Sequence, residues 1–325
     1  MKALKSFRLI AACAAFALPA VLMAQTVLKG SDVQPAGYPN VVALENMGKK
    51  LEVATKGKYK IQMFPGGVLG SEKEMIEQAQ IGALQIARIS LGPMGPVVPD
   101  VNVFNLPFLF RDEAHMRAVI DGPIGKELLD KITASSARLV GLGWMDSGSR
   151  SMYTKNAVNK PADLTGQKIR VMGNPMFVEM MNAMGGNGIS MGHNDTFSAL
   201  QTGVVDGAEN NPPTFFASNQ YTAGPKFYSE TNHLIVPELF VMSKITWDKF
   251  SKDEQALIMK LSREAQLEQR VLWDKSVGEY VTKLKASGIT FVKVDKKPFY
   301  DATAPIRAKY GVQFADLIKR IEATK

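Results

Sequence analysis

Three arginines in apolar, strand-like surroundings are the residues best suited to bind a charged ligand. A guanidinium is rarely buried unless it is paired. Its planar fork can give a carboxylate two parallel, charge-assisted hydrogen bonds that a lysine cannot reproduce. The alternative for each arginine is a pair with an internal Asp or Glu, or a place on a solvated edge. The three are Arg88 within residues 84–90, Arg150 after the small-residue turn 146–149, and Arg170 within residues 167–172.

Residues 209–213 (ENNPP) follow a predicted strand at 204–208 and precede a predicted helix. Ligands of layered α/β proteins bind beyond the carboxyl ends of strands, and asparagine amides both donate and accept hydrogen bonds. This position makes Asn210 and Asn211 candidates for ligand binding. The alternative is a plain turn, in which an Asn caps the helix and a Pro occupies its first turn.

A capping box at residues 71–74 (SEKE) opens a predicted helix that ends near Gly82. In such a box Glu74 is the reciprocal partner of Ser71. Glu72 has no capping role, so its carboxylate is freer to face a cleft.

No residue pattern in the chain indicates catalysis, a metal or a cofactor. The histidines His115, His193 and His233 form no metal-binding pair. Residues 66–70 (GGVLG) lack the Lys-Ser/Thr of a phosphate loop, and residues 148–152 (GSRSM) lack the second glycine of a hydrolase nucleophile elbow. We therefore expect a protein that is not an enzyme and that uses no metal or cofactor.

The composition is that of a globular chain without affinity for nucleic acid. The chain has 325 residues, 46% apolar and 22% charged, which is enough for two domains of ordinary size. Its formal net charge is +8, but Lys2, Lys5 and Arg8 supply three of these charges. We find no run of Lys and Arg with interleaved aromatic residues of the kind that follows a phosphate backbone.

Residues 1–24 have the form of a secretory signal peptide. Positive residues precede an apolar stretch at 9–22, and Ala24 ends a cleavage site before the mature chain. The alternative is a lipoprotein box at residues 10–13 (IAAC), but Arg8 lies too close to Cys13 to leave a full apolar region. Cys13 is the only cysteine, so the mature, exported chain contains no disulfide.

Strand and helix patterns alternate along the chain, which favours a layered α/β architecture. A second capping box at residues 251–254 (SKDE) opens a helical pattern that runs to about Lys285, with Gly288 as its stop. A helix of roughly 35 residues is about 50 Å long, more than one small domain covers. We therefore expect it to brace two domains, and the lack of a Ser/Gly-rich linker indicates that several strands join them.

Four motifs carry a resemblance to a known family: residues 64–70 (FPGGVLG), 105–110 (NLPFLF), 163–171 (DLTGQKIRV) and 199–210 (ALQTGVVDGAEN). With the long helix, they resemble the substrate-binding subunit of a tripartite ATP-independent periplasmic (TRAP) transporter of the DctP type. The resemblance implies an α/β fold of the two-domain, type II periplasmic-binding-protein class, with a central ligand cleft and the long helix crossing both domains. The expected boundaries are a signal peptide at 1–24, domain I at 25–147 with 236–275, and domain II at 148–235 with 276–325.

The resemblance also implies roles for individual residues. Arg170 is the arginine that binds the ligand carboxylate through two hydrogen bonds, Arg150 assists it, and Asn210 completes carboxylate recognition. The other residues expected to bind the ligand are Tyr38, Glu72, Arg88, Ser90, Asp146, His193 and Asn211.

The expected ligand is a sugar acid. Ionised Glu72 and Asp146 accept hydrogen bonds from hydroxyl groups but repel a second carboxylate. Residues 87–90 (ARIS), 146–151 (DSGSRS) and 209–211 (ENN) are similar to family members that bind hexuronates such as D-glucuronate and D-galacturonate. A C4-dicarboxylate is the alternative, and Arg88 then serves its second carboxylate.

Two positions depart from the family pattern. His193 lies where members often have an aromatic residue against the ligand, and Pro212 lies where some sugar-acid binders have a bulkier residue. The charge of an imidazole changes near neutral pH, so His193 is expected to make ligand affinity depend on pH.

The expected partners are a small organic acid and the small and large membrane subunits of a transporter. The resemblance implies a monomer that captures its ligand in the periplasm and delivers it to these subunits. The alternative of a different class is a periplasmic sensor module that presents its ligand to a signalling receptor.

Overall fold

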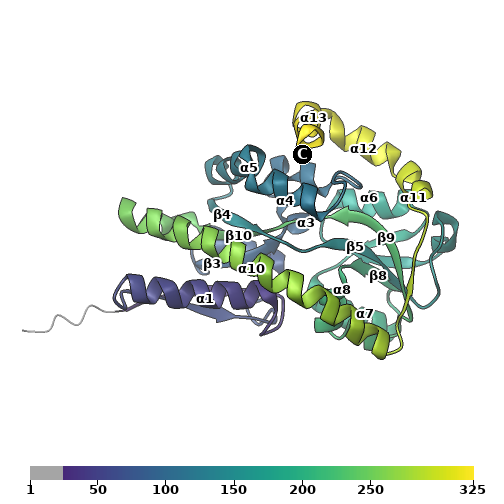
Figure 1. The fold of residues 1–325 in the computed structure, drawn as a ribbon, viewed down its shortest axis with the longest axis horizontal. Helices are drawn as coiled ribbons and strands as arrows, with labels where there is room; N and C mark the ends of the chain where they lie inside the picture. Colours follow the sequence, from purple (N-terminus) through teal and green to yellow (C-terminus); the bar gives the residue numbers. More distant parts are fainter. Residues whose placement is uncertain (1–24) are drawn as a thin grey trace, which may run out of the picture.

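Two mixed β-sheets covered by helices make up the protein in a computed structural model that describes residues 25–325 (Figure 1). The predicted signal peptide and Cys13 lie outside the described residues. The first sheet has the strand order β2-β1-β3-β10-β4. Its strands are β1 (Thr26–Ser31), β2 (Tyr59–Phe64), β3 (Ile86–Ser90), β4 (Leu139–Met145) and β10 (Glu238–Ser243).

The second sheet has the strand order β11-β9-β5-β8-β6-β7. The chain passes between the sheets three times, from β4 to β5, from β9 to β10 and, through α10, from β10 to β11, so no single tether joins the two halves. The strands of the second sheet are β5 (Ser149–Thr154), β6 (Lys168–Val171), β7 (Asn187–Ser190), β8 (Gly207–Asn210), β9 (Phe227–Ile235) and β11 (Thr290–Val292).

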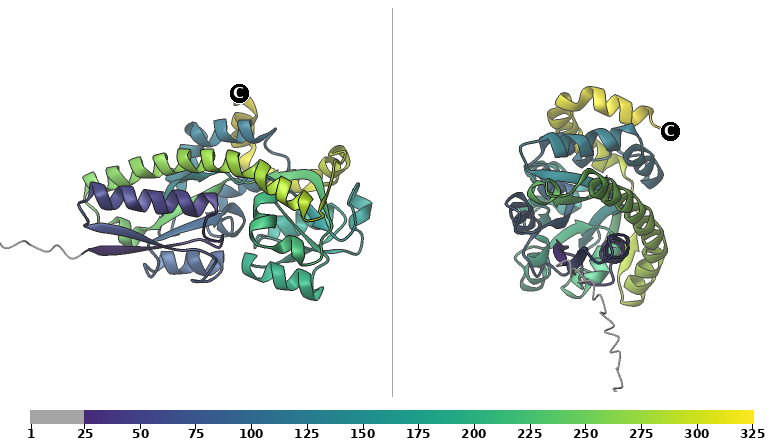
Figure 2. Two further views of the ribbon diagram at one scale, coloured as in Figure 1. Left: turned by 60° about the horizontal axis from the view of Figure 1, so that its bottom comes forward. Right: turned by 90° about the vertical axis from the view of Figure 1, so that its left-hand side faces the viewer.

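Helices flank both sheets (Figure 2). Among residues 25–325, no helix has the length and apolar character that crossing a membrane requires. The helices are α1 (Pro39–Ala54), α2 (Glu72–Gln80), α3 (Leu91–Met94), α4 (Glu113–Asp121), α5 (Pro123–Ala134), α6 (Pro175–Ala183), α7 (His193–Thr202), α8 (Pro212–Ala217), α9 (Lys244–Trp247), α10 (Lys252–Ala286), α11 (Lys297–Ala302), α12 (Ala304–Gly311) and α13 (Ala315–Ala323), with 3-10 turns η1 (Pro99–Asn105), η2 (Pro161–Leu164), η3 (Gln220–Thr222) and η4 (Val312–Phe314).

The long helix α10 runs along both halves of the molecule (Figures 1 and 2). Its capping box is present: Ser251 N donates to the Glu254 carboxylate at 2.8 Å, and Glu254 N donates to Ser251 Oγ at 3.2 Å. The helix has 35 residues and packs on α1 and β4 in the first half and on α8 in the second. The predictions of an α/β fold and of a long helix that braces both halves are therefore confirmed.

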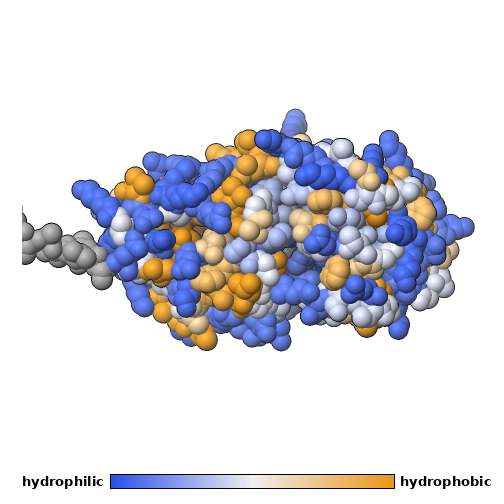
Figure 3. Space-filling model, turned by 90° about the horizontal axis from the view of Figure 1, so that it is seen from below, coloured by the Kyte–Doolittle hydropathy of each residue, from blue (hydrophilic) through white to orange (hydrophobic). Residues whose placement is uncertain are grey.

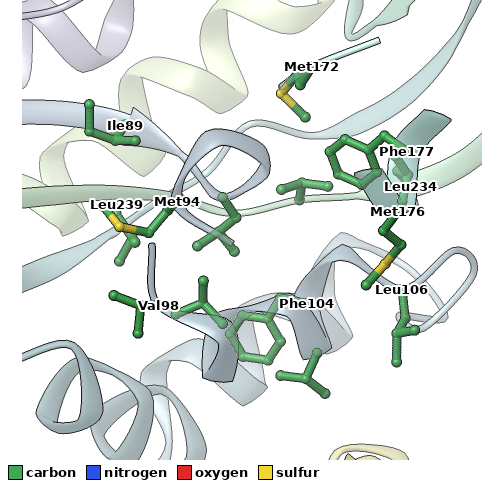
Figure 4. Close-up of a cluster of buried hydrophobic side chains, with 14 of the residues drawn as sticks. Ile89, Met94, Val98, Phe104, Leu106, Met172, Met176, Phe177, Leu234 and Leu239 are labelled. Atoms are coloured by element: carbon green, nitrogen blue, oxygen red, sulfur yellow. The ribbon is translucent and has the colours of Figure 1, made fainter. Parts of the chain in front are cut away.

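A hydrophobic core continues from one half of the molecule to the other (Figure 4). Ile89 and Leu239 come from the first sheet, while Met172, directly after β6, and Phe177 in α6 come from the second half. Gly92 in α3 lets the two halves approach closely, because a Cβ at this position would lie 2.9 Å from Met172 Cβ and 2.9 Å from Phe177 Cε2. The burial of these apolar side chains therefore holds the two halves together.

Some elements differ from the sequence-based predictions. The strand predicted at 204–208 begins at Gly207 and extends to Asn210, and Val204 is 53% exposed. The reason is that α7 ends at the left-handed Gly203, and the next residues form bends before pairing with β5 and β6 begins. The sequence analysis did not predict α5 or α11 to α13.

The domain boundaries remain a prediction. Helix α13, however, contacts α5 in the first half: Arg320 forms an ion pair of 2.6 Å with Glu127, and His115 Nε2 lies 2.8 Å from Ile321 O. These contacts favour placing residues 315–323 with domain I rather than with domain II.

The surface seen from below is mostly hydrophilic, with apolar patches between the charged side chains (Figure 3). Most of the large apolar side chains are buried in the cores, which is the distribution expected of a folded globular chain.

We predict that Gly92→Ala lowers the free energy of unfolding by about 1–3 kcal/mol, because the added methyl group overpacks the contact with Met172 and Phe177. Urea denaturation measures the change. The control is Gly278→Ala on α10, where an added Cβ meets no atom within 4 Å and alanine is the better helix former. Equal stability of the Gly92→Ala protein and the wild type would show that the two halves are not closely packed here.

Candidate functional site

A narrow cavity lies where the ends of five strands from both sheets meet. Ser90 at the end of β3 pairs with Glu238 at the start of β10, and Ser151, which follows Arg150, pairs with Asn210 at the end of β8. Strand register thus brings together side chains that are far apart in the sequence. About 250 Å³ between them is free of protein atoms, and this volume includes space that is open to solvent. The lining residues are Val33, Gln34, Glu72, Ser90, Arg150, Arg170, Met172, His193, Asn210 and Glu238.

Arg170 carries a buried positive charge without a carboxylate partner among the described residues. Its side chain lies on β6, is 2% exposed, and donates from Nε and Nη2 to the backbone oxygen of Met191 at 3.0 and 2.8 Å. Its buried Nη1 has no hydrogen-bond partner within residues 25–325. Burial, and then the nearby charge of Arg150, lowers the pKa of the Arg170 guanidinium. An anion in the cavity would neutralise the buried guanidinium and accept a hydrogen bond from its Nη1.

Arg150 is already neutralised by Glu209. Arg150 Nε and Nη2 donate to the two carboxylate oxygens of Glu209 at 2.6 and 2.7 Å, and Nη1 donates to Asn210 Oδ1 at 2.7 Å. Burial alone would raise the pKa of Glu209, but Arg150 and the neighbouring His233 lower it to about 2. Of the two alternatives for Arg150, the internal ion pair is therefore present, while the side chain still lines the cavity.

Asn210 keeps its amide nitrogen available to a ligand. Its Oδ1 accepts from Arg150 and from Asn211 N, and no hydrogen bond within residues 25–325 uses its Nδ2. Arg150 therefore orients the amide of Asn210, which sits at the cavity wall.

Arg88 is enclosed by three carboxylates and does not line the cavity. The guanidinium is fully buried. It donates to Asp32 Oδ1 at 3.0 Å, to Glu238 Oε2 at 2.6 Å and to Glu72 Oε1 at 3.2 Å. Burial raises the pKa of Asp32 and of Glu238 even though Arg88 opposes this shift. Arg88 thus holds Glu72 and Glu238 in place, and no hydrogen bond in the described residues uses Glu72 Oε2.

Besides Arg88, three of the predicted residues do not line the cavity. Asp146 faces the other way, with its carboxylate 2.5 Å from Arg117 Nε and 3.5 Å from Arg270 Nε. Asn211 caps α8 by accepting from Thr214 N at 2.7 Å, which is the plain-turn alternative. Tyr38 hydrogen-bonds to Thr214 Oγ1 at 2.9 Å. Asp146 is the main correction, because two arginines on α4 and α10 occupy the carboxylate that was expected to contact the ligand.

The sequence analysis missed four residues that line the cavity: Val33, Gln34, Met172 and Glu238. A lone carboxylate at the start of an apolar strand was a usable signal for Glu238. Gln34 lies in a loop without a periodic pattern. Its Nε2 donates to Thr214 Oγ1 at 3.2 Å, and its buried Oε1 has no partner in the described part of the chain.

His193 lies in the cavity wall at the start of α7, but it is not a pH switch near neutrality. Its Nε2 lies 3.0 Å from Ser218 Oγ. Burial, with the positive charges of Arg170, Arg88 and Arg150, lowers the pKa of His193 to about 3. The imidazole is therefore neutral at physiological pH, which corrects the expected change of charge.

Comparison with known proteins shows the family to which the chain is similar. Residues 30–313 match the model of the bacterial extracellular solute-binding proteins, family 7 (DctP). A solute-binding protein of Chromohalobacter salexigens is 38% identical over 275 residues, which is 84% of this chain and 81% of that protein.

Solved structures are similar over almost the whole chain. A TRAP periplasmic solute-binding protein of Pseudomonas putida F1 with bound D-glucuronate is 61% identical, with a TM-score of 0.91 over 92% of this chain and 98% of that one. A Bradyrhizobium protein in complex with D-galacturonate is 43% identical, with a TM-score of 0.89 over 92% of this chain and all of that one.

A protein of Citrobacter koseri was solved in two states. Its D-glucuronate complex is 52% identical, with a TM-score of 0.91 over 93% of this chain and 100% of that one. Its open structure without ligand gives a TM-score of 0.80 at 51% identity, over 91% of this chain and 98% of that one. The present structure is therefore more similar to the ligand-bound state than to the open one.

We predict that His193→Gln leaves the pH dependence of ligand affinity unchanged between pH 5.5 and 8, because an imidazole with a pKa of about 3 stays neutral over this range. Calorimetric titration with D-glucuronate at both pH values measures it. A pH effect from Asp32 or Glu238 would be the same in the variant and the wild type. A pH dependence present only in the wild type would contradict the low pKa.

Proposed function

Because the chain belongs to family 7 of the bacterial extracellular solute-binding proteins, the DctP family, we propose that it captures a hexuronate such as D-glucuronate or D-galacturonate. The observation that carries the proposal is the unpaired, buried guanidinium of Arg170. The hexuronates bound to similar proteins from Pseudomonas putida and Bradyrhizobium support this choice of ligand.

In this proposal the ligand carboxylate sits against Arg170. Nη1 is the free donor, while the two bonds to Met191 O fix the plane of the guanidinium. The free amide of Asn210 gives the carboxylate a second donor, and Arg150 adds positive potential without giving up its bond to Glu209. Such preorganised donors bind an anion without the cost of ordering flexible side chains.

The hydroxyl groups of the sugar face the opposite wall. Glu72 and Glu238 offer carboxylate oxygens and Gln34 offers an amide oxygen, all of which accept hydrogen bonds from hydroxyls. The same carboxylates repel a second carboxylate of the ligand. Arg88 is enclosed by its own acidic partners, so it is a positioning residue and not a site for a C4-dicarboxylate.

Ligand capture in this proposal is coupled to closure of the two halves. The first half provides Gln34, Glu72 and Glu238, and the second half provides Arg170 and Asn210. A ligand that contacts both walls binds the closed state better than the open one and shifts the equilibrium toward closure.

We further propose that the mature protein works in the periplasm and delivers its ligand to the membrane subunits of a TRAP transporter. The signal-peptide pattern of residues 1–24 and the family membership support this location and these partners.

We predict that two matched substitutions affect different properties: one lowers the affinity for the ligand and the other lowers the stability of the ligand-free protein. Arg170→Met removes a charge that lacks an acidic partner, so the melting temperature of the ligand-free protein should change little while affinity for D-glucuronate falls by about 3–5 kcal/mol, or more than about 100-fold. Arg150→Met leaves the buried Glu209 with only His233 beside it, so it should destabilise the ligand-free protein by about 3–5 kcal/mol.

Thermal unfolding and calorimetric titration of both variants with D-glucuronate and D-galacturonate separate the two roles. Wild-type affinity in the Arg170→Met protein would overturn the assignment of the carboxylate site. Failure of the wild type to bind either hexuronate would overturn the proposed ligand.

A further inference from the structure

A groove adjoins the cavity on the surface where the two halves meet. It lies between α2 and the segment after α3 on one side, and the ends of β6 and β7 with the start of α7 on the other. Glu72, Arg170 and His193 line both spaces, so the groove and the cavity meet at these side chains. The groove has about 1070 Å³ free of protein atoms and is partly open to solvent, while the cavity has about 250 Å³.

The groove has an apolar lining that the proposed function does not use. Ile76 comes from α2, Pro93, Pro96 and Val97 come from the segment around α3, and Met191 follows β7. Met191 is also the residue whose backbone oxygen holds Arg170. A lining of this kind favours an uncharged and largely apolar group.

The charges around the groove disfavour an anionic occupant. Among the described residues that line it, Glu72, Glu77 and Asp195 carry carboxylates, while Lys73 and Arg170 carry positive charges. When Arg170 holds the carboxylate of a hexuronate, the remaining charge of the groove is negative. A second carboxylate would therefore be repelled.

Gly173 leaves the groove open directly beside the cavity. It lies three residues after Arg170 and lines the groove but not the cavity. A Cβ at Gly173 would meet no heavy atom within 4 Å, and its φ lies outside the left-handed region. A larger side chain is therefore compatible with the backbone and would project into open space.

The chemistry of a hexuronate places its linking positions near its carboxylate. The carboxylate is carried by C5, which is bonded to C4 and to the ring oxygen, and C1 lies on the other side of that oxygen. The oxygens on C1 and C4, which form glycosidic bonds, are thus only a few bonds from the carboxylate. With the carboxylate on Arg170, a substituent on either oxygen starts close to the groove.

Resting on the proposed function, we propose that the groove receives an uncharged substituent of the hexuronate, so that the protein binds hexuronates glycosidically linked to a neutral group as well as the free sugar acids. The groove is open in a structure that is more similar to the ligand-bound state than to the open state of the Citrobacter koseri protein. A substituent in the groove therefore does not obstruct closure of the cavity around the sugar ring.

Calorimetric titration of the mature protein with D-glucuronate and with 4-nitrophenyl β-D-glucuronide tests the proposal. We expect the two dissociation constants to lie within about tenfold of each other. The control is 4-nitrophenyl β-D-glucoside, which lacks the carboxylate and should not bind. Digalacturonate, with its second carboxylate, should bind at least about tenfold more weakly than the nitrophenyl glucuronide.

The variant Gly173→Leu adds a bulky side chain to the lining of the groove, beside the cavity. It should weaken binding of the nitrophenyl glucuronide by at least about tenfold while changing the affinity for free D-glucuronate by less than about threefold. The matched control is Gly278→Leu on the exposed surface of α10, where an added Cβ also meets no atom within 4 Å. Retained binding of D-glucuronate shows that the variants are folded.

The possible outcomes distinguish this proposal from the proposed function. Binding of D-glucuronate without binding of the nitrophenyl glucuronide would refute the proposal that the groove receives a substituent. It would leave the proposed hexuronate function intact. An equal change in the affinities for both ligands in the Gly173→Leu protein, or no change in either, would also refute the proposed role of the groove. Equal binding of digalacturonate would contradict the preference for a neutral substituent. Failure to bind any hexuronate would refute both the proposed function and the proposed role of the groove.

Discussion

A guanidinium loses its hydration when it is buried, and only hydrogen bonds and opposite charge offset that loss. Arg88 and Arg150 meet this requirement through acidic partners within the protein. Arg170 is equally buried but has only the backbone oxygen of Met191 and a free Nη1. The difference between these three arginines makes Arg170 a site that a carboxylate ligand can complete, and the other features of the cavity depend on it.

The fold keeps these charges apart and in register. Arg88 lies on the first sheet, while Arg150 and Arg170 lie on the second, and the chain crosses between the sheets directly beside the cavity. Helix α10 packs on both halves, and the apolar contact between Gly92 and Met172 joins them beside the cavity. The cavity therefore lies between walls from both halves, which the long helix and the continuous core hold in position.

Local sequence patterns were sufficient to predict several of the elements but not all of them, and not all of the site. The capping boxes at Ser71 and Ser251 predict α2 and α10 because these signals act within a few residues. Family resemblance assigned Arg170 and Asn210 to the site, and both line the cavity. The orientation of Asp146 depends instead on Arg117 and Arg270, which are distant in sequence. The low pKa of His193 likewise arises from burial and from three arginines that only the fold brings together.

In this account the buried charge of Arg170 selects a ligand with a carboxylate, and the opposite cavity wall accepts hydrogen bonds from the hydroxyl groups of that ligand. Calorimetric titration with D-glucuronate and with D-glucuronamide, its neutral isostere, tests this claim on the unmodified mature protein. D-Glucuronate should bind at least about 100-fold more tightly, since the amide leaves the guanidinium without an opposite charge. Equal affinity for the two compounds, or tighter binding of the amide, would contradict the role assigned to Arg170.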